Sequence, residues 1–270
     1  MNRIEEMWAH LAFLFNELNA TNGWGQEHGP DWTFGDVPYH LAYLNRDVII
    51  RGLELGPDLP EADQTLLTNP KEVNAWNDHR FTRRPADQTV TQSLAQWRAS
   101  CEEIRTLASQ MDDAHLERPF WIPAYMGWVT ARDGLALCYI HDWSHFTQLR
   151  IQMGRTEPRP SAAITRGYLS AMLNLMTRFL NRDAAGGREF SVVMAFTDPD
   201  VGAWTIHVGK GRATVSDGRA ADADLIITQS AETFEKSLQR MHDPVEAIES
   251  GQIQVSNFES LGTFGELFPM

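Results

Sequence analysis

Two histidines stand four residues apart in the segment CYIHDWSHFTQLR, residues 138–150. His141 and His145 fall in an otherwise apolar, helix-like stretch, where a four-residue step places both imidazoles on one face of a helix. Helical metal sites use this spacing to offer two ligands to one ion. Gln148 and Cys138 extend the same face, because positions 138, 141, 145 and 148 follow in steps of three, four and three.

A third histidine, His40, lies on another predicted helix. That helix begins at Thr33 and the helix of the pair begins at Thr130, each in the pattern Thr-x-x-Asp, which is close to a capping box. At about 1.5 Å per residue, His40 lies about 10 Å along its helix, and His141 and His145 about 16 and 22 Å along theirs. Two such helices packed side by side bring the three imidazoles together, as in metal sites built in the core of a helix bundle.

Each of these histidines taken alone is explained as well by a hydrogen-bonded core residue. The pattern HxxxHxxQ on a long apolar helix, with a third histidine on another capped helix, favours a metal site. Cys138 is expected to be a small core residue. The remaining histidines have no partner at ligand spacing, and we expect them on the surface or in loops: His10, His28, His79, His115, His207 and His242.

Three neutral imidazoles would leave a cation with at least one open position, which is typical of a catalytic site rather than a structural one. Imidazole suits Zn, Ni or Fe(II), and Zn is the first choice. The open position would hold water or a thiol, either of which loses its proton more readily on a metal. Asp142 and Gln148 are candidates to orient the imidazoles, although Asp142 follows His141 directly and could instead face solvent.

The composition excludes several classes of protein. A net charge of −13 argues against nucleic acid and against a basic membrane-surface patch. The two cysteines, Cys101 and Cys138, form no disulfide framework, which fits a cytoplasmic protein. The segment MNRIEEMWAHLAF lacks the pattern of a secretion signal, and no apolar run is long enough to span a membrane.

The hydrophobic period changes near residue 160. Before it the period is helical, and we expect helices near residues 4–18, 34–53, 89–111 and 131–153, with no strand before residue 150. After the linker GRTEPRPSA, a helix over 163–180 is followed by the short strand patterns FSVVMAF, AWTIHV, RATV and LIIT. Two short helices, the strand QIQVS and a last helix close the chain. The sequence therefore predicts an all-α four-helix bundle over 1–155 and an α+β domain over 163–270.

The segments DWTFGDVPYHLAYLNRDVI and TARDGLALCYIHDWSHFTQLR resemble the DinB-like metalloenzyme family, over residues 3–155. Members of that family are four-helix bundles with one histidine from the second helix and an HxxxH pair from the last. The resemblance implies His40, His141 and His145 as ligands and makes 52–88 the long connection between helices two and three. Asn77 and Arg80 in that connection are candidates for substrate contact, with a solvated loop as the alternative.

The second half resembles the sterol-carrier-protein type-2 family over residues 165–270, in the segments ADLIITQ, DPVEAIESGQIQV and TFGELFP. That resemblance implies a five-stranded sheet covered by helices. Some members enclose a lipid tunnel, and others use the module as a lid or for dimerisation. A homodimer and a lipid-binding role both stay open.

The two modules together resemble the architecture of mycothiol-dependent maleylpyruvate isomerases and related low-molecular-weight-thiol enzymes. The first position of the histidine pair is a carboxylate in that isomerase pattern and His141 here. This departure weakens the transfer of the isomerase reaction and its substrate to this chain. Three function classes result. They are a metal-dependent transferase or isomerase that uses a small thiol, a metal-dependent hydrolase without a thiol, and a non-catalytic binder of lipid or another small molecule. For the enzymes, the short linker 154–162 with its two prolines leads us to expect the second domain at the wall or mouth of the metal cleft, with a rigid spacer or a dimer interface as the alternative.

Overall fold

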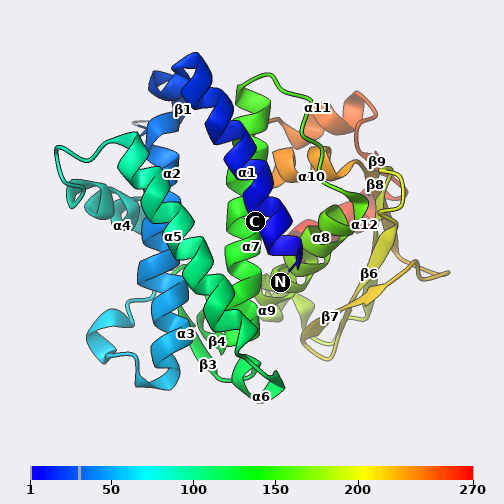
Figure 1. The fold of residues 1–270 in the computed structure, drawn as a ribbon. Coiled ribbons are helices and arrows are strands. Elements are labelled where there is room, and N and C mark those ends of the chain that lie inside the picture. The colour runs from blue at the N-terminus through cyan, green and yellow to red at the C-terminus, as the bar shows by residue number, and fades with distance from the viewer. Residues whose placement is uncertain (1, 30–31, 270) are drawn as a thin grey trace. The chain divides into compact units, whose positions relative to one another are not determined.

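The computed structural model describes residues 2–29 and 32–269 (Figure 1). The chain divides into two compact units, Met1–Pro158 and Arg159–Met270. The first unit is mostly helical and the second contains a sheet. Asp31, with which the first family-like segment begins, lies outside the described residues, as do the two terminal methionines.

Long helices make up most of the first unit, and they run where the hydrophobic period predicts them. Helix α2 packs beside α5, and α1 packs beside α7 (Figure 1). The side chains Met7, Leu11 and Leu14 of α1 are fully buried, as the amphipathic pattern requires. The long helical segments are α1 (Asn2–Thr21), α2 (Val37–Leu44), its π-helical continuation η3 (Asn45–Ile50), α3 (Arg51–Leu55), α5 (Val90–Ser109) and α7 (Ala131–Gln152).

Both predicted capping boxes are present where the histidine-bearing helices begin. The Asp36 carboxylate accepts a hydrogen bond from the Thr33 amide at 2.7 Å, ahead of the 3-10 turn η2 (Phe34–Asp36) that leads into α2. At the start of α7, the Asp133 amide donates to the Thr130 hydroxyl at 3.2 Å. These caps fix the first turns, and thereby the axial positions, of the helices that carry the three histidines.

The expectation of a first domain without strands is wrong. Two short hairpins occur there, β1 (Glu27–Gly29) with β2 (Trp32–Thr33) and β3 (Pro119–Ile122) with β4 (Gly127–Thr130). Strands of two to four residues are too short for a period of two to stand out from the helical pattern around them.

Phe120 of β3 fills the space between α3 and α7. A Cβ added to Gly134 of α7 would lie 2.7 Å from the Phe120 ring, and one added to Gly52 of α3 would overlap the same ring. Glycine at both positions therefore lets one aromatic ring separate two helices at close range. The hairpin braces α3, which continues the helical segment of His40, and the start of α7, whose later turns carry His141 and His145.

The connection 52–88 contains a helix that the sequence pattern does not predict, α4 (Pro70–Thr82), capped by the Asn69 side chain. Ahead of it, Leu67 pairs with the β3–β4 turn, donating to the Pro123 carbonyl at 2.7 Å and accepting from the Tyr125 amide at 2.8 Å. These hydrogen bonds hold the connection against the β3–β4 hairpin. The remaining short helices are η1 (Gly23–Gly25), η4 (Gly56–Asp58), η5 (Glu61–Asp63) and α6 (Asp113–Leu116).

The second unit contains a five-stranded sheet in the order β7-β6-β5-β8-β9 (Figure 1). The central strand β5 pairs antiparallel with β6 and parallel with β8, and its residues 192–196 are all buried. The strands are β5 (Phe190–Phe196), β6 (Ala203–Gly209), β7 (Arg212–Asp217), β8 (Leu225–Gln229) and β9 (Gln254–Val255). The helices are α8 (Ala162–Met176), η6 (Thr177–Phe179), α9 (Arg182–Ala185), α10 (Ala231–Leu238), α11 (Pro244–Glu249) and α12 (Phe258–Leu267).

Within the described part of the chain, no helix has the length and apolar character needed to cross a bilayer.

Candidate metal centre

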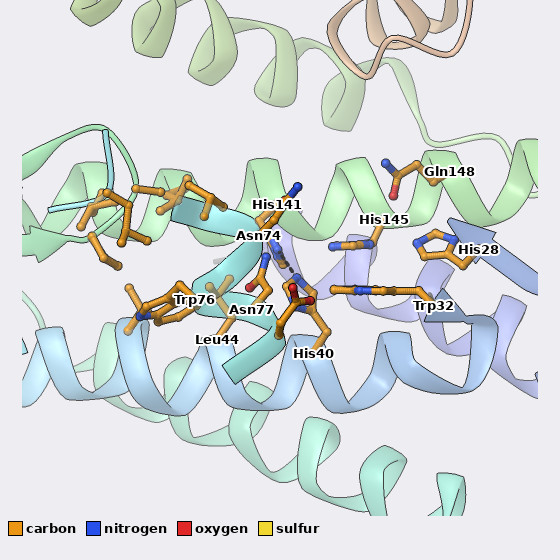
Figure 2. Close-up of a pocket in the computed structure, with 18 residues that line it drawn as sticks. His28, Trp32, His40, Leu44, Asn74, Trp76, Asn77, His141, His145 and Gln148 are labelled. Atoms are coloured by element: carbon orange, nitrogen blue, oxygen red, sulfur yellow. Dashed lines mark hydrogen bonds between the residues drawn. The ribbon is translucent and has the colours of Figure 1, made fainter. Parts of the chain in front are cut away.

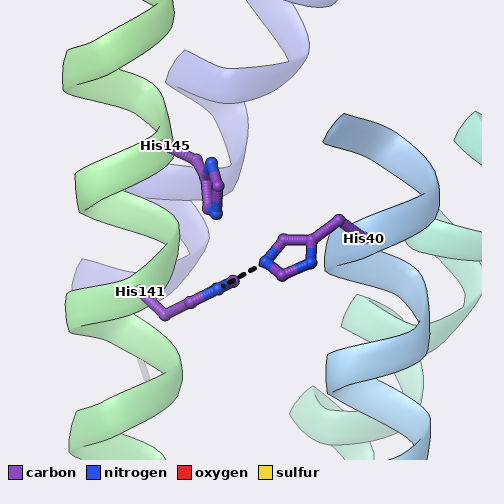
Figure 3. A group of neighbouring side chains, drawn as sticks. All are labelled: His40, His141 and His145. Carbon is purple, nitrogen blue, oxygen red and sulfur yellow. Dashed lines mark hydrogen bonds between the residues drawn. The ribbon is translucent and has the colours of Figure 1, made fainter. Parts of the chain in front are cut away.

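Three imidazoles converge in the first unit, one from α2 and two from α7 (Figure 3). The ring centroids of His40, His141 and His145 lie 4.6–4.9 Å apart in each of the three pairs. One nitrogen of each ring lies within 4.8 Å of those of the other two. His40 and His141 approach most closely, with 2.8 Å between their Nε2 atoms. The capped helices thus bring together the three histidines that the sequence pattern singles out.

This arrangement fits a small divalent cation. Zn–N bonds of about 2.0–2.1 Å in a tetrahedron place ligand nitrogens about 3.3 Å apart. The observed nitrogen separations run from 2.8 Å to at most 4.8 Å and so bracket that value. The donor set of three nitrogens and no thiolate suits Zn, Ni or Fe(II).

Hydrogen bonding to Tyr43 assigns the tautomer of His40. Burial raises the pKa of the Tyr43 phenol, so the hydroxyl keeps its proton and donates it to the Asn77 side-chain oxygen. The same hydroxyl lies 2.8 Å from His40 Nδ1 and has only its lone pairs left to offer. His40 therefore carries its proton on Nδ1, which leaves the Nε2 lone pair facing the cluster.

Asp142 lies behind His141 and is fully buried, so the alternative that it faces solvent is wrong. Its Oδ2 accepts a hydrogen bond from the Trp8 indole at 2.7 Å, and its Oδ1 lies 3.5 Å from His141 Nδ1. A carboxylate behind a histidine favours the Nδ1–H tautomer and turns Nε2 toward the site. The helix α1 thus reaches the cluster through Trp8.

His145 carries a buried polar atom that the described residues leave unpaired. Its Nδ1 is inaccessible to solvent and has no hydrogen-bond partner among them. Removal from water, reinforced by the neighbouring histidines, holds the pKa of both His40 and His145 well below the ordinary value. Both imidazoles are consequently neutral at physiological pH, which is the form that binds metal.

The cluster opens into a pocket of about 530 Å³ that is lined entirely by residues of the first unit (Figure 2). Gln148 lines it one turn beyond His145, and Asn77 lines it from α4. Arg80 does not line it. Its guanidinium lies 4.2 Å from the centre of the Trp76 ring, and its Nε lies 3.0 Å from the Asp47 carboxylate.

Cys138 is a core residue, as expected. It is fully buried, and its thiol donates to the Asn45 side-chain oxygen at 3.6 Å. Burial raises the pKa of the thiol well above its ordinary value, so Cys138 does not offer a thiolate.

A fourth histidine contributes to the pocket, although the sequence pattern placed it among the surface or loop histidines. His28 of β1 lines the pocket with its ring centroid 5.8 Å from that of His145. Gln152, the last residue of α7, donates to the His28 carbonyl at 2.8 Å and accepts from His28 Nδ1 at 2.7 Å. The pairing joins positions 124 residues apart, and no local spacing signals it.

Trp32 is a second residue that the sequence pattern missed, and its ring lies 4.9 Å from that of His40. Tyr43 is a third. Its position three residues after His40 places both on one helix face, and this local signal was available in the sequence.

Comparisons with known proteins place the first unit in a family. The model described as the DinB superfamily matches residues 3–149, which is more than half of the chain. Among curated proteins, none matches this chain.

The whole chain is also similar to solved structures. The crystal structure of the mycothiol-dependent maleylpyruvate isomerase covers 94% of this chain and 92% of its own, with a TM-score of 0.53 and 11% identity. A mutant of the same isomerase gives the same values. At this identity the likeness shows the fold alone. A ubiquinone-synthesis protein described as UbiJ-SCP2 covers 40% of this chain with a TM-score of 0.28, too low to carry an argument. From the match over residues 3–149, the chain belongs to the DinB superfamily.

Proposed function

We propose that this protein is a divalent-metal-dependent enzyme in which His40, His141 and His145 bind one metal ion, with zinc as the first choice. The observation that carries the proposal is the convergence of three imidazole nitrogens within 4.8 Å at the wall of a 530 Å³ pocket. Three protein ligands and an adjoining pocket are the features of a catalytic site rather than a closed structural one.

The reaction class that we propose is transfer or isomerisation with a low-molecular-weight thiol. When bound, a divalent cation lowers the pKa of a thiol in its open position. The residues of the chain orient the imidazoles that would bind this cation. Tyr43 and Asp142 hold two imidazoles with Nε2 toward the site. Shared fold with a thiol-dependent isomerase supports this class, whereas the histidine at position 141 leaves the isomerase's own substrate out of the proposal.

We also propose the finer architecture that the family implies. The helices of the first unit would form the DinB-type four-helix bundle over 1–155, and the second unit would be a sterol-carrier-protein type-2-like domain over 163–270. A cytoplasmic location and a homodimer are part of the same hypothesis. The expectation that the second domain lines the metal cleft stays a prediction. Comparing the turnover of residues 1–158 with that of the full chain tests it, and equal turnover would refute it.

Cobalt substitution tests the thiol hypothesis directly. The protein is loaded with Co²⁺ and titrated with cysteine and with glutathione while its absorption spectrum is recorded. A thiol that reaches the metal adds a sulfur-to-cobalt charge-transfer band, and His145→Ala should abolish the band. Cobalt bound in full without any band for these thiols, together with hydrolysis of ester or amide probes, would instead support the metal-dependent hydrolase.

A further inference from the structure

The pocket has two chemically different ends with the histidine cluster between them (Figure 2). His28, Trp32 and Gln148 lie on one side of the cluster. Leu44 and Trp76 lie on the other. On α7, Leu137 precedes His141 by four residues and Gln148 follows it by seven, which places them about 6 and 10 Å away along the axis in opposite directions.

The end that holds Leu44 and Leu137 is apolar and braced. Val48 lies one helical turn beyond Leu44, and Leu67 is hydrogen-bonded to Pro123, the residue after Ile122. The aliphatic residues that line the pocket are Leu44, Val48, Leu67, Val73, Ile122 and Leu137. Leu67 and Ile122 are buried, and the Leu67 backbone is hydrogen-bonded on both sides to the β3–β4 turn. This end is therefore formed by fixed backbone segments before any ligand arrives, which reduces the cost of ordering on binding.

Positive charge is absent from the described lining of the pocket. No lysine or arginine is among its residues, and the only carboxylate is that of Asp78. An anionic group in the apolar end would lose its hydration without gaining a cationic partner, which is costly. The chain's net charge of −13 adds to the repulsion of anions.

We propose that the apolar end binds an uncharged aliphatic or aromatic part of the organic substrate, whose reacting group lies at the histidine cluster. The part of this inference that concerns the reacting group rests on the proposed function. The apolar end itself is defined by residues that need no metal. The substrate class is thus a molecule with an uncharged apolar tail rather than one with charged groups at both ends.

The test uses n-alkan-1-ols from butan-1-ol to octan-1-ol, titrated calorimetrically into the full chain after chelator treatment and again after zinc addition. Affinity should rise about three- to fourfold per methylene until the apolar end is filled, with the same slope in both states. In the chelator-treated protein, where no zinc can bind a carboxylate, the ω-hydroxy carboxylates of equal length should bind at least tenfold more weakly than the alcohols.

Arginine substitutions locate the effect. Leu137→Arg should abolish the rise of alcohol affinity with chain length. It should also raise the affinities of the carboxylates to at least those of the alcohols. Val73→Arg on α4 provides the same test if the first variant does not fold. Leu66→Arg is the matched control, because Leu66 is exposed and does not line the pocket, and it should leave both series unchanged.

The outcomes separate this inference from the proposed function. If alcohol affinity rises with chain length in a protein that binds no zinc, the apolar end is supported and the proposed metal-dependent enzyme is refuted. If alcohol affinity does not change with chain length in folded protein, or rises only when zinc is present, the inference is overturned while zinc binding stands. In the zinc-free unmodified protein, carboxylate affinities equal to those of the alcohols would also overturn it. So would arginine variants whose alcohol and carboxylate affinities are unchanged.

Discussion

His40 Nδ1 lies 2.8 Å from the hydroxyl oxygen of Tyr43, whose proton is donated to Asn77. This chain of two hydrogen bonds, the relay, connects α2 with α4. It fixes which nitrogen of His40 is free to bind a metal. It also gives Asn77 a role that differs from the predicted substrate contact, because its side-chain oxygen is used by Tyr43.

Tyr43→Phe should weaken zinc binding by about tenfold or more, on the scale measured when a hydrogen-bond partner of a ligand is removed. The phenyl ring keeps the packing against Trp76, so only the hydroxyl is lost. The measurement is zinc affinity by competition with a chromogenic chelator. Tyr39→Phe is the control, because that hydroxyl donates to the Arg80 carbonyl and not to a histidine. Equal zinc affinities in the two variants would rule out the relay.

Acid should destabilise the metal-free protein through its buried histidines. His40 and His145 have folded-state pKa values well below 6.5, so the unfolded chain binds more protons than the folded one as the pH falls below about 6.5. The free energy of unfolding therefore decreases as the pH is lowered below about 6.5, by up to about 1.4 kcal/mol per pH unit for each histidine.

Urea unfolding of chelator-treated protein between pH 7.5 and pH 5 measures this dependence. His145→Gln removes one of the two groups and should reduce the slope. If the variant and the unmodified protein have the same slope, His145 is not excluded from protonation in the folded state.

Gly134→Ala should lower the free energy of unfolding by about 1–3 kcal/mol, the range for overpacked cores. The added methyl group would lie 2.7 Å from the Phe120 ring, closer than a Cβ atom packs in folded proteins. Phe120→Leu in the same chain should recover part of the loss. Gly262→Ala in α12 is the control, since no atom lies within 4 Å of its added Cβ. Urea unfolding that gives equal stabilities for the two alanine variants would show that the ring does not wedge the helices.

Local patterns predict the parts of this fold that depend on neighbours in sequence. The apolar period locates the long helices, the Thr-x-x-Asp pattern fixes their starts, and the spacing of His141 and His145 puts both on one face. These features follow from helix geometry, because the residues concerned lie within one or two turns of each other.

Apart from the meeting of His40 with His141 and His145, the sequence did not predict the contacts between distant segments. His28 reaches the pocket because a three-residue strand is hydrogen-bonded to Gln152, the last residue of the 22-residue helix α7. The wedge of Phe120 between Gly52 and Gly134 likewise joins three segments, and each glycine alone reads as a weak point in a helix. The half-buried face of α4 mixes Val73 and Trp76 with Asn77 and Arg80, so the hydrophobic period gave no sign of this helix.

The metal content of the protein tests the central claim most directly. Full-length protein purified without added metal, and the same protein after chelation and zinc reconstitution, should hold one metal ion per chain by elemental analysis. His145→Ala should lose stoichiometric metal. His207→Ala, which removes an exposed histidine of the second unit, should keep it. Equal metal content in the two variants, or no metal in the reconstituted unmodified protein, would contradict the assignment of His40, His141 and His145 as the ligands.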